Sequence, residues 1–317
     1  MGANTTRWLV IFITSTLNKL RRNILKAIII SALALTLSAC GTLPEATQPK
    51  QVSLNFSAQI NGQAFECGKS YANVGATRST ITPSDFRMYV SEVNLLRQDG
   101  SSVPVQLTQD GVWQYQNVAL IDFENGTGPC RNGTSATNTS VRGTVPTGDY
   151  VGVVLTVGVP FAQNHQDPTV APAPLNSTAM FWNWQGGYKF IKFDTTSSGI
   201  SEQKPATANA MGPVTRYSVH LGSTACAGES KTKAPSACQN PNRIVVSMPH
   251  FDLAKNTVVL DMGAVLAQAN VDVNAKGISP GCMSFLKDAD CPPVMNALGL
   301  AYDGVAASGP QRLLSKR

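Results

Sequence analysis

The sequence lacks the local motifs that mark common enzyme classes. It contains no G-x-S-x-G, no H-E-x-x-H, no P-loop and no G-x-G-x-x-G. No pattern therefore points to an α/β-hydrolase, a zincin, an NTPase or a dinucleotide-dependent enzyme. Histidine is also scarce, with three in 317 residues. A hydrolase with a dispersed Ser–His–Asp site stays open as an alternative, but we expect a protein that is not an enzyme.

Acidic residues are absent from the first 39 positions, which hold five of the 25 basic residues. Removing those five leaves 20 basic against 19 acidic residues, so the formal charge of +6 belongs mostly to the N-terminal segment. Because the rest of the chain has almost no basic excess, nucleic-acid binding loses its main support.

The N-terminal segment has the composition of an export signal. Residues 17–26 are basic, and residues 27–37 form an apolar run too short to span a bilayer. LSAC at 37–40 resembles the lipobox of bacterial lipoproteins. We expect 1–39 to be a lipoprotein signal peptide and Cys40 to be lipidated, with a secretory signal cut near Ala39 as the alternative. Gly41, in place of Asp, favours an outer-membrane anchor, with the protein facing the periplasm or the cell surface.

No C-x-x-C motif occurs, and six cysteines remain once Cys40 is set aside. An even number in an exported chain predicts up to three disulfides, although sequence alone does not fix their pairing. Short loops favour Cys226–Cys238 and Cys282–Cys291, which leaves Cys67–Cys130. A thiolate metal site is the alternative, and the wide spacings and the oxidising compartment argue against it.

Strong amphipathic helical patterns are missing, apart from short ones at 262–271 and 284–300. Instead, residues 53–62 alternate between apolar and polar, which predicts a half-buried strand. In 85–96 the apolar phase changes near Ser91–Glu92, which predicts a bulge or twist. Further strands are predicted at 112–123, 149–159, 188–194, 216–222, 242–253 and 256–262.

Many short strands at near-regular spacing predict an all-β, sandwich-like fold with long loops, a few short helices and disulfides. We expect one domain over 53–317 after a tether at 40–52, with two small domains as the alternative. The Pro-rich segment 163–180 is predicted to be a long loop, and such loops on β scaffolds often carry function.

The scarce aromatic and histidine residues gather in one region. FWNWQGGYKF at 181–190 holds Trp182 and Trp184, two of the three tryptophans after residue 39, and NHQDP upstream holds His165. Period-two geometry would place both tryptophans on one strand face. Imidazoles suit copper, zinc and nickel, and His220 lies in the strand pattern RYSVHLG. The alternative is three unrelated histidines and a hydrophobic plug of tryptophan.

Several blocks of the sequence are recognisable together: DFRMYVSEVNLL, ALIDFENGTGPC, VPFAQNHQDP, APLNSTAMFWNWQGGYKF, HLGSTAC, CQNPNR, and GCMS with CPPVMNALGL. In this order they resemble the MbnP-like family, also called the metallo-mystery pair four-Cys motif proteins. The family is named for a periplasmic protein of methanobactin gene clusters. The blocks extend over roughly residues 53–315, which is nearly the whole chain after the tether.

The resemblance implies an exported copper-binding protein, with Cu(I) or Cu(II) as the ion. Family members are encoded beside a MauG-like di-haem cytochrome c peroxidase, which oxidises a tryptophan of its protein substrate to kynurenine. By resemblance, His165 and His220 are the copper ligands, and Trp182 or Trp184 is the modified residue. His250 is a further ligand candidate without a family counterpart.

The resemblance also implies roles for the cysteines. The four family cysteines would be Cys226, Cys238, Cys282 and Cys291, and Cys67 with Cys130 would form an additional bridge. A different function remains open beside the copper hypothesis: a surface-anchored β-sandwich that binds a ligand or partner through its tryptophan pair, without metal.

Overall fold

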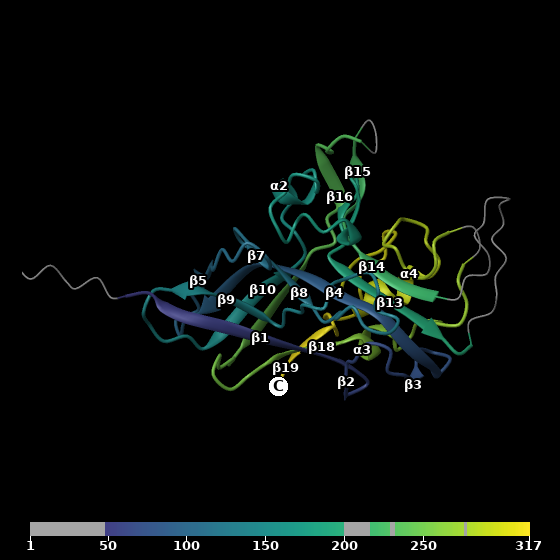
Figure 1. Cartoon of the computed structure of the whole chain (residues 1–317), viewed down its shortest axis with the longest axis horizontal. Coiled ribbons are helices and arrows are strands. Elements are labelled where there is room, and N and C mark those ends of the chain that lie inside the picture. The colour runs from purple at the N-terminus through teal and green to yellow at the C-terminus, as the bar shows by residue number, and fades with distance from the viewer. Residues whose placement is uncertain (1–47, 200–215, 229–231, 276–277) are drawn as a thin grey trace, which may run out of the picture. The chain divides into compact units, whose positions relative to one another are not determined.

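The strands of this chain form two large β-sheets and two short hairpins (Figure 1). The structure is a computed structural model that describes residues 48–199, 216–228, 232–275 and 278–317. The strands are β1 (Lys50–Ile60), β2 (Gln63–Ala64), β3 (Tyr71–Val74), β4 (Ser79–Leu96), β5 (Ser102–Pro104), β6 (Gln106–Leu107), β7 (Gln114–Tyr115), β8 (Val118–Asp122), β9 (Ser140–Val145), β10 (Gly152–Val157), β11 (Phe181–Asn183), β12 (Gly187–Tyr188), β13 (Ile191–Ser197), β14 (Arg216–Leu221), β15 (Thr224–Ala227), β16 (Ala237–Asn240), β17 (Ile244–Pro249), β18 (Val258–Asp261) and β19 (Leu314–Lys316). The helical elements are α2 (Phe161–Asn164), the 3-10 turn η1 (Thr178–Met180), α3 (Met262–Leu266) and α4 (Cys291–Ala297). The predicted all-β, sandwich-like class is therefore confirmed.

Strand β1 is the centre of the first sheet, whose order is β19–β18–β1–β9–β6, with β2 also paired to β1. It runs antiparallel to β9 and parallel to β18, where Phe56 lies opposite Val258. The side chains of Leu54, Phe56, Ala58 and Ile60 are buried. The alternation in the sequence thus predicted this strand and its buried face.

Strand β4 organises the second sheet, which follows the order β14–β13–β4–β10–β17. One edge of β4 pairs with β13 along its first half and with β10 along its second half. The other edge pairs in turn with β3, β8 and β5. A strand of 18 residues can serve five partners because each partner is short.

A bulge interrupts β4 where the sequence predicted one. Val154 of β10 pairs with Asn94, whereas Thr156 pairs with Ser91, so the register shifts between them. Glu92 takes a left-handed conformation with φ of 53° at this point. The extra residue exchanges the two faces of the strand, which explains why the apolar phase changes there.

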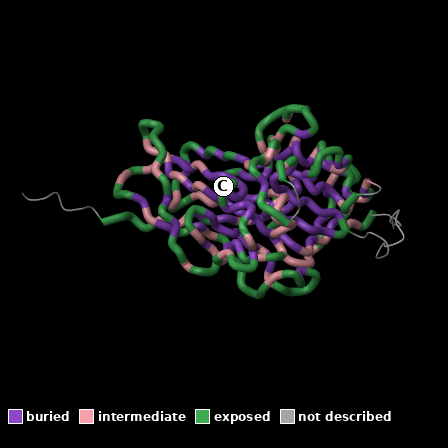
Figure 2. The backbone as a smooth tube through the Cα atoms, turned by 90° about the horizontal axis from the view of Figure 1, so that it is seen from above, coloured by how far each residue is buried: buried purple, intermediate pink, exposed green. Residues whose placement is uncertain are grey.

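Apolar residues from both sheets and from helices α3 and α4 form one contiguous core. Figure 2 shows the buried backbone along the centre of the fold, with exposed loops around it. The middle of β4 and the first five residues of β13 are buried on both faces. One of these faces carries charged side chains, and the candidate site is built next to them.

Three disulfides join the six cysteines: Cys67–Cys130, Cys226–Cys238 and Cys282–Cys291. The pairing favoured by short loops is thus confirmed. The second bridge links β15 to β16 across their hairpin, where the two cysteines are directly paired.

Both helices predicted from the sequence, at 262–271 and 284–300, are present, but each is shorter than predicted. Helix α3 ends at Leu266, and α4 begins only at Cys291. Two prolines follow Cys291 at the start of α4, the position where proline suits a helix because its missing N–H has no intrahelical partner.

Within the described ranges, no helix is long and apolar enough to cross a membrane. The predicted signal peptide and Cys40 lie outside the described residues.

Candidate metal centre

The β11–β12 hairpin holds the tryptophan pair. Phe181 pairs with Tyr188 and Asn183 with Gly187, so β11 ends at Asn183 and Trp184 belongs to the turn. The expectation that both tryptophans share one strand face is therefore wrong, because the strand is too short to include Trp184. Both side chains are half-buried.

The ring of Trp182 packs between two other segments. Its centroid lies 5.2 Å from that of Phe285, at an interplanar angle of 36°. On another side the ring covers Gly222, where a Cβ atom would come within 2.4 Å of Cζ3. Only glycine leaves room for the indole at this position, so HLGS in the sequence shapes the surroundings of Trp182.

His165 follows helix α2 and faces the backbone of the tryptophan turn. Its Nδ1 lies 2.9 Å from the carbonyl oxygen of Trp184, which can only accept, so Nδ1 carries the proton. Burial lowers the pKa of His165 and outweighs the opposite effect of this hydrogen bond. The ring is then neutral near pH 7, and the unprotonated Nε2 has a lone pair that accepts a hydrogen bond.

The Nε2 atom of His165 faces the hairpin disulfide. It lies 3.5 Å from Sγ of Cys238 and 3.2 Å from Nδ2 of Asn164. The donor atoms of His165, Cys226 and Cys238 all lie within 4.8 Å of one another, and they form the only such group of three among the described residues. In the disulfide form the two sulfurs are not thiolates, so Nε2 is the group's one conventional metal ligand.

His220 lies on β14 and is buried. Its Nε2 is 2.8 Å from Oδ1 of Asp194 on the neighbouring strand β13. Burial lowers the pKa of His220 more than Asp194 raises it. Burial acts to raise the pKa of Asp194, but the hydrogen bond and charge of His220 and the charge of Lys192 outweigh it and hold that pKa well below its usual range. Because Nε2 donates to Asp194, Nδ1 is the nitrogen left for another partner.

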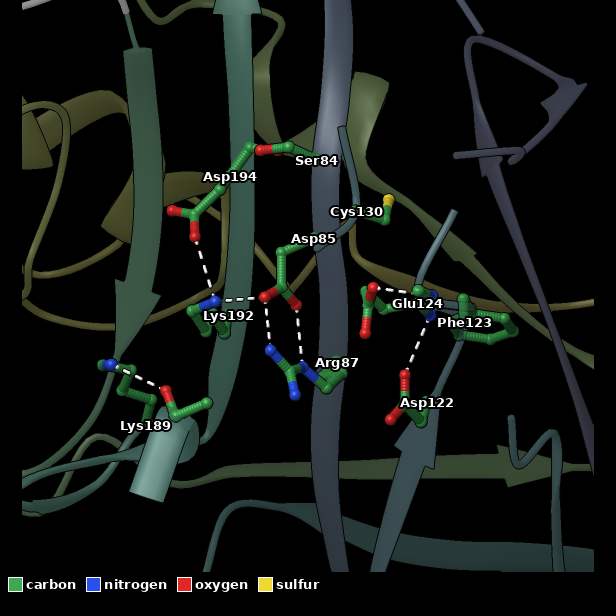
Figure 3. Close-up of polar contacts among 12 residues, drawn as sticks. Ser84, Asp85, Arg87, Asp122, Phe123, Glu124, Cys130, Lys189, Lys192 and Asp194 are labelled. Carbon is green, nitrogen blue, oxygen red and sulfur yellow. Dashed lines mark hydrogen bonds and ion pairs between the residues drawn. The ribbon is translucent and has the colours of Figure 1, made fainter. Parts of the chain in front are cut away.

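The carboxylate of Asp194 belongs to a buried row of charges that crosses the second sheet (Figure 3). Lys192 contacts Asp194 at 3.1 Å and also pairs with Asp85, which in turn holds the guanidinium of Arg87. Sequence reasoning missed this row. The signal for it was present as D-x-R at 85–87 and K-x-D at 192–194, since period two puts each pair on one strand face.

The two histidines approach the tryptophan hairpin at different points. Asn164, next to His165, accepts a hydrogen bond from the backbone N–H of Tyr188 at 2.8 Å and donates to Oγ of Ser223 at 3.2 Å. Gly222, under the ring of Trp182, comes two residues after His220. Segment 220–223 therefore runs along the hairpin, but His220 is not part of the three-residue donor group.

His250 lies apart from these contacts, in an exposed turn after β17 with φ of 58°. Its carbonyl oxygen accepts a hydrogen bond from Lys316. The structure gives this histidine no contact with the tryptophan hairpin among the residues it describes.

Known proteins match this chain over a range that includes the residues described above. The sequence profile of the MbnP family matches residues 49–284, a range that includes both tryptophans, His165 and His220. Among solved structures, MbnP from Methylosinus trichosporium superposes with a TM-score of 0.73 and is 31% identical; the alignment covers 85% of this chain and 98% of that chain. No curated protein matches the sequence.

Proposed function

This chain belongs to the MbnP family, and from that premise we propose that it is an exported copper-binding lipoprotein. In this proposal a partner di-haem cytochrome c peroxidase of the MauG-like type oxidises one tryptophan of the 182/184 pair to kynurenine. The chain is then the partner's protein substrate and not an enzyme. Copper is its bound ion, and kynurenine is its modified residue.

The observation that carries the proposal is the hydrogen bond from Nδ1 of His165 to the carbonyl of Trp184. It fixes the imidazole tautomer, so that Nε2 is unprotonated and would bind a metal beside the tryptophan turn in place of its hydrogen bond from Asn164. Burial keeps this ring neutral, which is the form that binds metal. The residue types therefore suit a copper ion.

His220 would bind the ion through Nδ1, with Asp194 orienting the ring from Nε2. A carboxylate behind a metal-bound histidine is a common arrangement, and it makes the imidazole a better donor. Two imidazoles form a set of ligands that suits copper among the first-row metals.

Oxidation to kynurenine would add the missing third donor. The partner would remove four electrons from the indole and pass them to two molecules of hydrogen peroxide. The C2–C3 bond breaks, oxygen from peroxide or water enters, and the C2 carbon leaves as formate, so the residue gains one oxygen atom and loses one carbon atom in net. The product has an aryl amine, whose nitrogen has a lone pair that the indole N–H does not offer. Half-burial of both tryptophans leaves each indole within reach of a partner's surface.

Peptide mass spectrometry tests the maturation step. The chain is produced with and without the di-haem partner, and the peptide that spans 181–190 is analysed. We expect the net change of kynurenine at Trp182 or Trp184 only after co-production, together with a rise in bound copper. An unmodified pair after co-production with an active partner would overturn the maturation claim.

A second function has one observation in its favour. Phe285, which packs against Trp182, is 47% exposed, and the next residue, Leu286, is 45% exposed. A hollow of about 270 Å³ adjoins Phe285. Exposed aromatic and apolar side chains of this kind are typical of partner-binding surfaces. If the protein binds a ligand or partner there without metal, a His165→Ala, His220→Ala double variant will keep any copper affinity unchanged.

A further inference from the structure

A cavity of about 470 Å³ lies on the polar face of the second sheet. Its floor is formed by Arg87 of β4 with Leu120 and Asp122 of β8. Its walls come from three segments, residues 111–113, 132–136 and 173–179. None of the residues that line it belongs to the candidate metal centre.

Two opposite charges at the floor face each other without pairing. Arg87 and Asp122 are directly opposite in the β4–β8 register, yet no ion pair joins them among those found in the described residues. Both residues are buried, at 3% and 4% exposure. Cross-strand partners of opposite charge can approach closely, but these two side chains do not reach ion-pair distance.

Each of the two groups has one atom without a partner. Arg87 binds Asp85 through Nε, at 2.8 Å, and through Nη2, and Nη1 makes no hydrogen bond to a described residue. Asp122 accepts the backbone N–H of Glu124 on Oδ1 at 2.8 Å, and its Oδ2 is likewise unbonded. Both atoms keep some solvent-exposed surface, since neither is among the unpaired polar atoms that are fully buried. In Figure 3 both point toward the same side of the view, away from Asp85.

The surrounding ion pairs leave Asp122 without a cationic partner of its own. Asp85 is shared by Arg87 and Lys192, and Asp194 is held by Lys192. Asp122 has no such partner, and neither has Glu124, whose Oε2 is buried and unpaired. Burial raises the pKa of Asp122 to about 7, because the Glu124 backbone N–H and the charge of Arg87 offset it only in part.

We propose that this cavity binds a free α-amino acid with an apolar side chain. The carboxylate accepts from Nη1 of Arg87, and the ammonium donates to Oδ2 of Asp122. The apolar side chain lies against Leu120 and the half-buried ring of Trp113. A zwitterion satisfies both free atoms at once, whereas a simple anion or a simple amine satisfies one and leaves the other unpaired.

Isothermal titration of the mature chain with L-leucine tests the proposal. Two control ligands each lack one of the charged groups: isocaproate has no ammonium, and isoamylamine has no carboxylate. We expect leucine to bind on the order of tenfold or more tightly than either control, because each lost charged hydrogen bond costs about that factor. No leucine binding, or equal binding of either control, would overturn the proposal.

The variant Asp122→Asn adds a second arm. It keeps the acceptor for Glu124 and removes the negative charge, so it should weaken leucine binding about tenfold without weakening the binding of isocaproate, which has no ammonium. The matched control is Asp149→Asn, the same change at an exposed site, which should bind leucine like the wild type. Unchanged leucine affinity in Asp122→Asn would refute the assigned pose. These outcomes are independent of copper and of tryptophan oxidation.

Discussion

At the scale of single residues, the copper proposal depends on two imidazoles with different surroundings. His165→Ala and His220→Ala should each weaken copper binding at least tenfold, because losing a ligand costs no less than losing its supporting partner. His250→Ala is the matched control, since that residue is exposed in the turn after β17. Affinity is measured by competition with a copper chelator on protein matured by the partner.

The same experiment separates the roles of the two histidines. If His250→Ala lost as much affinity as His165→Ala, the assigned ligand set would be wrong. If His165→Ala lost copper affinity and His220→Ala kept it, His220 alone would be removed from the ligand set. Its hydrogen bond to Asp194 would then serve only the buried row of charges.

Asp122 makes a prediction about pH and stability. Burial raises its pKa from 3.8 to about 7, against the opposing effects of the Glu124 backbone N–H and Arg87. The folded state therefore holds this proton more tightly than the unfolded state, and the stability that this provides is lost as the pH rises from about 4 to about 7. In Asp122→Asn that loss disappears. Between about pH 4 and pH 7, the free energy of unfolding of the variant should therefore rise by up to about 4 kcal/mol relative to the wild type.

Urea unfolding at a series of pH values measures this difference. The advantage of Asp122→Asn should grow up to pH 7 and stay constant above it, while Asp149→Asn should follow the wild type throughout. A difference that does not change with pH would mean that Asp122 ionises freely in the fold.

At this scale the sequence predicted the histidine beside the tryptophans but not what holds it. NHQDP and W-x-W are near each other in the chain, so their contact needs only a short turn. The partner of His220 is Asp194, which is 26 residues away and reaches it by strand pairing. The register between strands depends on the packing of the whole sheet, so no local sequence pattern predicts which residues lie side by side.

At the scale of elements, the three disulfides should differ in what their loss affects. In the loop-closure account, removing Cys67–Cys130, which encloses the longest segment, costs about 4 kcal/mol, and removing Cys226–Cys238 costs about 3 kcal/mol. The second bridge, however, lies 3.5 Å from Nε2 of His165. We expect the Cys67→Ser, Cys130→Ser variant to lose more stability and the Cys226→Ser, Cys238→Ser variant to lose more copper affinity.

Chemical unfolding and copper competition on both double variants check this. The two readouts should rank the variants in opposite order. The same rank order in both would indicate that copper affinity follows global stability, and that the hairpin bridge has no special part in holding His165.

Long alternating strands were predictable, and short ones were not. β1 and β17 show their buried faces in the sequence because one side packs on the core, and β4 alternates in the same way only toward its two ends. Strands of two residues such as β6 and β7 contain too few positions for a period to appear. The start of β9 at Ser140 directly follows a segment that looks like a loop throughout, and pairing with β1 defines it.

At the scale of the whole molecule, the proposed attachment to a membrane would depend on Cys40. In Cys40→Ser the thiol that would carry lipid is gone, so the protein should move from the detergent-rich phase to the aqueous phase in a phase-partition assay of cell fractions. The wild type should stay in the detergent-rich phase. Equal partition of the two would favour cleavage near Ala39 without lipidation.

The parallel pair of β1 and β18 has a consequence for how such a chain reaches its final state. If the chain is exported as proposed, its N-terminal strand arrives first, yet residues 258–261 that complete the edge of that strand follow about 200 positions later. Closing so large a loop is slow, and an unpaired strand edge invites aggregation in the meantime. The newly translocated polypeptide should thus stay open to proteases and periplasmic chaperones until almost all of it has emerged.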